Sequence, residues 1–394
     1  MRLLSAVVLA VFALVAPAAA QNAPRLQVKV VDVGAGLCCI VTAPGPRYMI
    51  FDAGNYEDRG VTAMTAIEAA IPFGSDIDLL VVSHGDADHI AAVPFICQNY
   101  KVRQVWREGF ARPTQTWQRA DEAIRREATD EGCLDFNLQA FDIDPGYQIP
   151  LGEATVTFIA GFSDIPSSWL PLSEGENVNA RSVVARVDFG QSSILFTGDT
   201  VGRHIGNDDD VCIAAERTMV DRAAEASIDV DVVIAPHHGA DNGSSQAFIQ
   251  AMSPRYVVFS AGSKHGHPSR NAANRYLNSG LSLSRMYRTD RGDNEGSQFE
   301  WRPTTGASRD PAGDDDILLS LARNGQVSIS YQPRTRVWSR SSASFRRSEC
   351  GPRLSGRRGP RADVGLRDSS RPVVAAGCQI CARRFALDRE TRAH

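Results

Sequence analysis

The chain has 394 residues, of which 43% are hydrophobic, and a formal net charge of −4. This length and composition suffice for one large domain or two small ones. The acidic balance argues against a protein that holds duplex nucleic acid on a strongly basic surface, because such binding depends mainly on Lys and Arg side chains that meet phosphates.

The first twenty residues have the pattern of a secretory signal peptide. Arg2 is followed by an apolar run from Leu3 to Val15 and then by Pro17-Ala18-Ala19-Ala20. A positive start, a short apolar core and an A-x-A end are typical of a cleaved signal, and the run is too short to span a bilayer comfortably. We therefore expect residues 1–20 to be removed. The mature protein, with no later membrane span, would be exported to the periplasm or beyond the cell.

Residues 25–333 have the alternating apolar pattern of one folded domain. Strands are expected at 26–33, 48–51, 77–83, 154–159, 182–189, 192–196, 230–235 and 256–260, and helices at 117–128, 214–226, 245–252 and 270–277. Pro44-Gly45-Pro46 predicts the turn of an early hairpin. Hairpins followed by alternating strands and helices indicate an α/β fold with mixed sheets covered by helices.

Four potential metal ligands follow the apolar strand that ends at Val82. They are His84, Asp86, Asp88 and His89, within six residues of a turn that leads into a helical stretch. A rigid strand end followed by a turn lets these side chains point in different directions, which suits two metal ions side by side. A helix N-cap or a solvated loop explains a single Asp at such a place, but not four ligand types so close together.

Three later segments place further ligand types directly after apolar strands. They contain Thr197-Gly198-Asp199, Pro236-His237-His238-Gly239 and His265-Gly266-His267-Pro268. Six of the eight histidines of the chain lie in the last two segments and in the turn after Val82. One such His is more often structural or exposed, but the clustering of six predicts a shared site.

The end of the chain differs sharply in charge. Residues 334–394 contain fifteen Arg, no Lys and five acidic residues, a net charge of +10, so residues 1–333 carry −14. Because this tail is rich in Ser, Gly and Pro and lacks hydrophobic periodicity, we expect it to be disordered rather than to build a core. An arginine-rich arm for nucleic acid is the functional alternative.

The cysteines do not form a disulfide framework. Five lie in the acidic body, so at least one is unpaired, and only Cys133 and Cys212, both in polar stretches, are candidates for a bridge. The Cys378-x-x-Cys381 spacing in the tail has no second pair beside it, and we interpret it as chance.

The motifs S-H-x-D-x-D-H, T-G-D, H-H-G and G-H-P, in this order, resemble the metallo-β-lactamase superfamily. More narrowly, the chain resembles the extracytoplasmic hydrolase domain of the competence (ComEC-type) family, over about residues 27–303. Val31–Gly36, Phe51–Gly54, Asn179-x-x-Ser182 and Arg288–Gly292 match further motifs of that domain. The resemblance implies a four-layer αββα fold, with two mixed β-sheets packed face to face and helices outside. It does not include a membrane channel.

The resemblance also implies a site for two divalent metal ions. We assign one ion to His84, Asp86 and His237, and the other to Asp88, His89 and His267, with Asp199 bridging them. His238 remains the alternative to His237. Three residues are expected to support the ligands from behind, namely Asp52, Asn179 and Ser182. Asn179 and Ser182 occupy the region where the superfamily usually has a Gly-His-Thr segment, which this chain lacks.

The ligand set bears on the choice of metal. Asp86 occupies the position at which the superfamily's commonest motif has a His. A carboxylate is a harder ligand than an imidazole and favours harder metal ions. We expect zinc, with manganese as the alternative.

Two ions held together would activate a water molecule for attack on phosphorus or on a carbonyl carbon. The residues expected to act in catalysis are Asp88 and Asp199, with His238 or His265 as the proton donor to the leaving group. The favoured substrate is a small phosphoester or single-stranded nucleic acid, hydrolysed by a monomeric phosphodiesterase or nuclease-like enzyme. The alternatives are an ester, lactone or β-lactam hydrolase, and a non-catalytic envelope binding module with a vestigial metal site.

Overall fold

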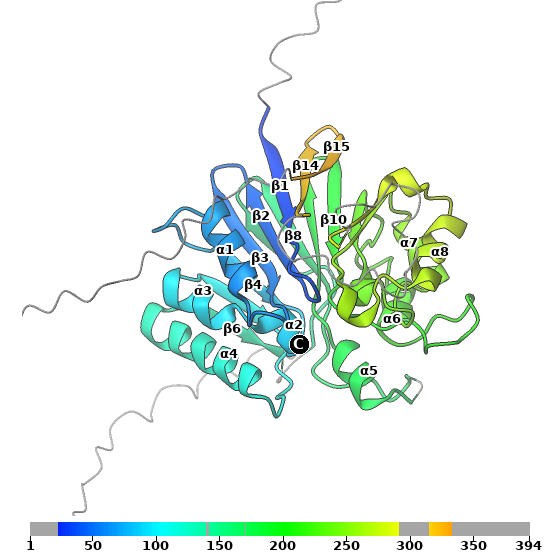
Figure 1. Cartoon of the computed structure of the whole chain (residues 1–394), viewed down its shortest axis with the longest axis horizontal. Coiled ribbons are helices and arrows are strands. Elements are labelled where there is room, and N and C mark those ends of the chain that lie inside the picture. Colours follow the sequence, from blue (N-terminus) through cyan, green and yellow to red (C-terminus); the bar gives the residue numbers. More distant parts are fainter. Residues whose placement is uncertain (1–22, 139–141, 170, 291–314, 333–394) are drawn as a thin grey trace, which may run out of the picture. The chain divides into compact units, whose positions relative to one another are not determined.

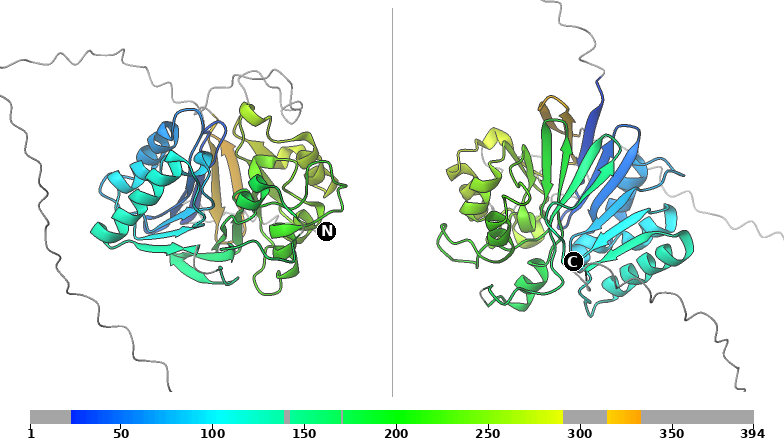
Figure 2. Two further views of the ribbon diagram at one scale, coloured as in Figure 1. Left: turned by 90° about the horizontal axis from the view of Figure 1, so that it is seen from below. Right: turned by 180° about the vertical axis from the view of Figure 1, so that it is seen from behind.

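Two mixed β-sheets lie face to face, and helices cover the outer face of each sheet (Figures 1 and 2). The structure is a computed structural model, which describes residues 23–138, 142–169, 171–290 and 315–332. The expected signal peptide and the arginine-rich tail lie outside the described residues. Among the described helices, none is long and apolar enough to cross a membrane.

The first sheet has eight strands in the order β15-β14-β1-β2-β3-β4-β5-β6. Their bounds are β1 (Arg25–Val30), β2 (Cys38–Ala43), β3 (Arg47–Ala53), β4 (Leu79–Val82), β5 (Gln104–Arg107), β6 (Leu134–Asn137), β14 (Ile317–Ala322) and β15 (Val327–Tyr331). Strands β3 to β6 are parallel, and the other neighbours are antiparallel. All four side chains of β4 are buried, as expected for a parallel strand covered on both faces.

The second sheet has seven strands in the order β13-β12-β11-β10-β9-β8-β7. Their bounds are β7 (Gln148–Leu151), β8 (Ala154–Ala160), β9 (Val184–Phe189), β10 (Ser192–Phe196), β11 (Val232–Ile234), β12 (Tyr256–Phe259) and β13 (Met286–Arg288). Strands β10 to β13 are parallel, whereas β7 to β10 are antiparallel. Each sheet therefore has one parallel half.

The helices form two outer layers. Those associated with the first sheet are α1 (Val61–Ala70), α2 (Ala87–Ile90), α3 (Val93–Asn99), α4 (Gln115–Arg126) and the π-helical turn η2 (Glu127–Glu131). The others are α5 (Glu174–Asn179), α6 (Ala214–Asp221), α7 (Gln246–Met252), α8 (Arg270–Asn278) and the 3-10 turns η4 (Pro236–Gly239), η5 (Ser263–His265) and η6 (Leu283–Arg285). Apolar clusters fill both helix–sheet layers.

The central core lies between the two sheets. Phe51 of β3 stacks on Phe196 of β10 with ring centroids 5.1 Å apart, and Trp106 of β5 stacks on Phe158 of β8 at 4.3 Å. These pairs join the two sheets by apolar surface that is removed from water, which is the main favourable contribution to folding. The predicted α/β class and αββα layering are confirmed.

The expected strands and helices of the domain are all present, with ends that differ by a few residues. The early hairpin is β2–β3, and Gly45 in its turn has φ 90°, a conformation that favours glycine. The prediction of a Cys133–Cys212 disulfide is wrong, because all five cysteines among the described residues are free. Cys133 instead packs in the helix-facing core, and Cys212 accepts a hydrogen bond from Ser245.

Candidate metal centre

The ends of five parallel strands bring the predicted ligands together. In the first sheet, Asp52 ends β3, and His84 follows β4 and leads into α2, which carries Asp88 and His89. In the second sheet, the loops after β10, β11 and β12 carry Asp199, the histidines of η4 and His267. The carboxyl ends of parallel strands lie at one edge of a sheet, which is where α/β proteins commonly bind ligands.

Glycines allow these strand ends to approach each other closely. A Cβ atom on Gly54 would lie 2.5 Å from the backbone of Asp88 and His89, and one on Gly198 would lie 2.6 Å from Cβ of Ser83. Gly198 also has a positive φ of 54°. The Gly in the T-G-D motif therefore lets Asp199 reach across to the loop that carries His84.

The first group of ligand atoms surrounds one oxygen of Asp199. Its Oδ2 lies 3.8 Å from His84 Nε2 and 3.6 Å from His237 Nε2. His84 Nε2 is also 3.7 Å from Asp86 Oδ2. The resemblance assigned His84, Asp86 and His237 to one ion, and the structure brings these three side chains together around Asp199.

The second group surrounds the other oxygen of Asp199. Its Oδ1 lies 3.3 Å from His89 Nε2 and 3.5 Å from His238 Nε2. Asp88 Oδ2 is 3.7 Å from His238 Nε2 and 3.9 Å from His89 Nε2. In two overlapping sets, His84–His89–Asp199 and Asp88–His89–His238, one ligand atom from each residue lies within 4.8 Å of the others.

His238 takes the place in which we expected His267. The φ angles of His237 and His238 are 50° and 56°, in the left-handed region that non-glycine residues rarely adopt. This kink turns both rings toward Asp199. The two histidines, which the sequence left as alternatives, are therefore both candidate ligands. His267 lies further out, with its ring centroid 5.9 Å from that of His237 and 6.5 Å from that of His238.

Asp52 holds the turn after β4 from behind. Its carboxylate accepts hydrogen bonds from the backbone N–H of Ser83 at 2.7 Å, from the Ser83 hydroxyl at 2.6 Å and from His89 Nδ1 at 2.8 Å. With Nδ1 so engaged, Nε2 of His89 is the atom that points into the site. This is the orienting role predicted for Asp52.

The other residues have supporting contacts of the same kind. His237 Nδ1 is 2.7 Å from Asn242 Oδ1, and His238 Nδ1 donates to the Ser260 carbonyl at 2.8 Å. The Ser182 hydroxyl accepts from the Asp199 backbone at 3.1 Å, as its expected position behind the ligands requires. Asn179 differs from the expectation, because its Nδ2 lies 3.3 Å from His237 Nε2, on the ligand side of that ring, and Asn242 instead contacts the opposite nitrogen.

Buried carboxylates dominate the electrostatics of the centre. Burial alone would lower the pKa of His89, but the carboxylates of Asp199, Asp52 and Asp88 raise it well above the usual range. Burial likewise opposes ionisation of Asp88, yet the imidazoles of His89 and His238 lower its pKa to about 2. His267 has the opposite environment, since burial and the neighbouring imidazoles lower its pKa to about 3.

The donor set fits divalent metal ions. His84 Nε2, Asp88 Oδ1 and Asp199 Oδ1 are buried and have no hydrogen-bond partner among the described residues. Buried polar atoms are normally satisfied, and imidazole and carboxylate groups that converge without partners are the usual ligands of zinc and manganese. Two ions, one beside each oxygen of Asp199, would satisfy these atoms.

The rim of the centre carries residues that the sequence did not single out. The Tyr56 hydroxyl hydrogen-bonds Asp88, and Lys264 Nζ lies 3.4 Å from the centroid of the Tyr56 ring. Arg112 Nη2 pairs with Asp86 Oδ1 at 2.9 Å. His265, expected as a proton donor, is exposed, and its ring meets that of Tyr56 edge-on with centroids 5.7 Å apart. No sequence motif identifies Lys264 and Arg112 as residues of the rim, because their positions depend on the conformations of loops.

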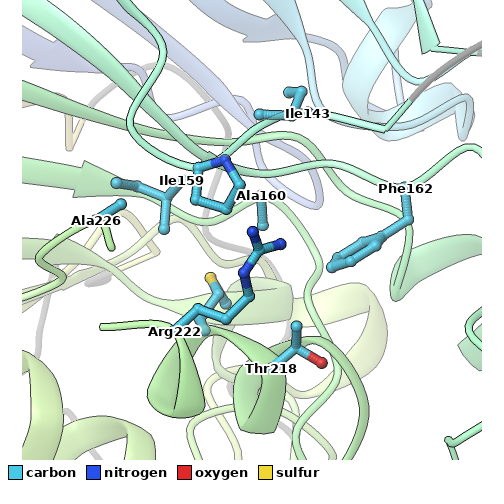
Figure 3. A pocket seen from close by; sticks show the side chains of 9 residues that line it. Ile143, Ile159, Ala160, Phe162, Thr218, Arg222 and Ala226 are labelled. Carbon is cyan, nitrogen blue, oxygen red and sulfur yellow. The ribbon is translucent and has the colours of Figure 1, made fainter. Parts of the chain in front are cut away.

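A recess in the second sheet's helix layer is not part of this centre. It lies between β8 and α6, has a volume of about 10 Å³, and is lined by Ile159, Phe162 and Arg222 among others (Figure 3). None of the predicted site residues lines it, and its volume is about that of a single water.

Sequence comparison places this fold and these motifs in a known family. Residues 31–262, more than half of the chain, match the family model of the metallo-beta-lactamase superfamily. The chain therefore belongs to the metallo-β-lactamase superfamily.

Within the superfamily, the chain is similar to competence proteins. It is 22% identical over 259 residues to ComE operon protein 3 of Bacillus subtilis, covering 61% of this chain and 29% of that protein. It is 25% identical over 263 residues to the competence protein ComA of Neisseria gonorrhoeae, covering 66% of this chain and 30% of that protein. The chain thus spans about 30% of the length of these relatives.

Solved structures give weaker similarities. CmlA, a diiron β-hydroxylase from Streptomyces venezuelae, has a TM-score of 0.40 and 16% identity, covering 68% of this chain and 53% of that chain. Igni18, a metallo hydrolase from Ignicoccus hospitalis, has a TM-score of 0.38 and 14% identity, covering 66% and 94%. At TM-scores below 0.5, neither structure informs the chemistry of this chain.

Proposed function

We propose that the protein is an exported metal-dependent hydrolase of phosphodiesters that uses two divalent ions. The observation that carries the metal-dependent part is the pair of buried His–Asp groups around the two oxygens of Asp199. Three of their atoms, His84 Nε2, Asp88 Oδ1 and Asp199 Oδ1, have no hydrogen-bond partner among the described residues. When bound, the ions would lower the pKa of a water molecule and stabilise the negative charge of the transition state.

The residues of the chain contribute orientation and charge. Asp52, Asn242 and Ser260 fix the ring orientations of His89, His237 and His238 through the nitrogen that faces away from the centre. Asp199, held at its backbone by Ser182, lies between the two groups. His265 at the rim is available to protonate a leaving group.

Two observations favour a phosphodiester over a carbonyl substrate. The similarity to competence proteins supports a substrate of the nucleic-acid type, as the resemblance of the sequence motifs implies. Lys264 and Arg112 add two cations at the rim of a centre that is otherwise acidic, and cations beside metal ions suit an anionic phosphate. The acidic body argues for a small phosphoester or single-stranded ends rather than duplex DNA. Export rests on the pattern of residues 1–20, and we expect the protein to act as a monomer.

The test combines metal content with turnover of two reporters. Protein reconstituted with zinc or manganese should bind about two ions per chain and hydrolyse an aryl phosphodiester but not a chromogenic β-lactam. Hydrolysis of only the β-lactam, or of only an aryl carboxylic ester, would contradict the phosphodiester substrate and favour a hydrolase of carbonyl substrates. Two bound ions without any turnover would favour a binding module, and no stoichiometric metal would overturn the proposal as a whole.

A further inference from the structure

The structure contains a second recess, a groove with a volume of about 520 Å³. Its wall includes Phe110, Trp169, Arg181, Pro166, Pro171 and Asn177. This volume lies within the range of small-molecule sites, and the mixture of aromatic rings with a few polar groups is typical of them. None of its lining residues belongs to the two ligand groups described above.

The loop after α5 joins the groove to the centre. Asn179 contacts His237 Nε2 at 3.3 Å, and the Ser182 hydroxyl accepts from the Asp199 backbone. Arg181, which lies between these two residues, lines the groove. Residues 179–182 therefore contact the metal centre at both ends and line the groove at Arg181. Figure 1 shows α5 toward the same end of the two sheets as α2.

The aromatic wall is held in place by polar contacts. The Arg181 guanidinium lies over the Phe110 ring, with its Cζ 4.5 Å from the ring centroid. The Phe110 backbone donates to the buried Glu108 carboxylate at 2.8 Å. Trp169 is fixed through its indole N–H, which donates to the Thr218 hydroxyl at 3.0 Å, and by edge-on contact with Phe162. Phe110 nevertheless remains 39% exposed.

Arg181 adds a guanidinium group to this wall. Its side chain is only 9% exposed, and one end of the guanidinium donates to the Ser163 carbonyl and pairs with Asp164. Its Nε has no partner among the described residues. This N–H is buried, so the part of Arg181 that faces the groove is the guanidinium plane that lies against Phe110.

Charge decides which part of a substrate fits. Asp164 and Glu174 at the groove disfavour a second phosphate there, whereas an uncharged flat ring suits the aromatic rings of Phe110 and Trp169. We propose that the groove binds the base of a nucleotide phosphodiester while its phosphate lies at the metal centre. This inference rests on the proposed function and specifies its substrate class.

Two substrates with one leaving group separate the groove from the chemistry. The 4-nitrophenyl ester of thymidine 5′-monophosphate should be hydrolysed with a kcat/KM about tenfold or more above that of methyl 4-nitrophenyl phosphate, because stacking of one base contributes that much. Phe110→Ala should remove this preference and leave the methyl ester unaffected. Phe95→Ala, which truncates an equally exposed Phe (40%) outside the groove, should retain it.

Equal rates for the two esters in the wild type, or an equal loss on both in Phe110→Ala, would overturn the groove assignment.

Binding is tested independently of turnover. Thymidine 5′-monophosphate should quench tryptophan fluorescence of the full-length protein, and ribose 5-phosphate should not. Trp169→Phe should abolish most of the quenching. If both esters are inert while this quenching is seen, the proposed hydrolysis fails and the groove stands; if the esters are cleaved without quenching or preference, the groove fails alone.

Discussion

Asp199 has a unique position among the residues of the centre. Its Oδ1 faces His89 and His238, and its Oδ2 faces His84 and His237. Burial opposes ionisation of Asp199, but the imidazoles of His89, His238 and His237 lower its pKa well below the usual range. A carboxylate between two pairs of imidazoles is the residue that can contact both ions at once.

Asp199→Asn should therefore cost more activity than loss of any single histidine. The amide keeps the shape of the side chain but removes the charge that balances two dications. We expect turnover of the phosphodiester to fall about a hundredfold or more, together with loss of one ion. Kinetics and elemental analysis on the same preparation check this, with His265→Ala as the control that keeps both ions. An Asn variant with two tightly held ions and normal turnover would contradict the bridging role.

Asp52→Asn tests the support behind the ligands. The substitution weakens three hydrogen bonds and the preference for His89 Nε2 as the atom that faces the centre. We expect metal affinity to fall about ten- to a hundredfold, as measured by competition with a chelator. Asp78→Asn is the matched control, since Asp78 accepts from the Tyr48 backbone at the other end of β4. An equal loss of metal affinity in both variants would mean that Asp52 only stabilises the fold and does not orient His89.

At this scale the sequence predicted which residues converge, but not how each one points. The motifs brought His84, Asp86, Asp88, His89 and Asp199 to one place, because ligands directly after buried strands have little freedom of position. The structure places His238 rather than His267 beside Asp199, since the direction of the His238 ring depends on the positive φ angles of η4, which no motif reveals. The assignment of these residues as metal ligands remains a prediction that the variants test.

Among the elements, three helices support the η4 turn from behind. Glu216 of α6 accepts from the backbone N–H groups of Ser244 and Ser245, which begin α7, at 2.6 and 2.7 Å. Arg275 of α8 donates to the carbonyls of Asp241, Gly243 and Ser244. These contacts satisfy the backbone of the segment that follows His237 and His238, and Asn242 within it contacts His237.

Glu216 makes the stability of this layer depend on pH. Burial raises its pKa to about 7 from an ordinary value of 4.5, so between these values the unfolded chain releases a proton that the folded chain retains. The contribution of this group to the free energy of unfolding is complete below about pH 4.5 and is lost as the pH rises through 7.

Glu216→Gln removes this titration. The difference in unfolding free energy between wild type and variant should therefore shrink from pH 4.5 to pH 8. Urea denaturation of the metal-free proteins at both pH values measures it. A difference that does not change with pH would show that the pKa of Glu216 is the same in the folded and the unfolded protein.

Elements with a strong apolar pattern were predictable, and short or edge elements were not. The buried strands β8, β10 and β12 and the amphipathic helix α4 appear where expected. The short strands β5, β6 and β13 and the hairpin β14–β15 were not predicted, because three to six residues carry little periodicity. Their positions are fixed by pairing with neighbours that are distant in sequence.

For the molecule as a whole, the hairpin β14–β15 adds two strands to the first sheet. Strand β14 pairs along all six residues of β1, and Leu319 and Leu321 join the core between the sheets. The first sheet thus includes residues up to Tyr331, beyond the region of sequence resemblance, which ends at about residue 303. The domain boundary near residue 333 remains a proposal.

Removal of residues 333–394 should leave folding, melting temperature and turnover unchanged, since the described core is complete at Gln332. Circular dichroism melting and the phosphodiester assay check this. A chain that ends at Asp290 is the contrasting variant, because it lacks β14 and exposes the β1 edge together with Leu26 and Val28. It should be insoluble or strongly destabilised. Loss of soluble protein in the longer chain as well would place part of the tail in the fold.

The ligands of the centre come from both sheets, with His84 to His89 on one side and Asp199 to His238 on the other. Metal ions held there would cross-link two halves of the chain that are more than a hundred residues apart in sequence. Folding and metal binding are then thermodynamically linked, so every ion that prefers the folded state also opposes separation of the sheets at that edge. In the metal-free protein this cross-link is absent, so amide hydrogen exchange at this edge should be faster than in the metal-loaded protein. Scarcity of metal would thus act on the lifetime of the protein as well as on its activity.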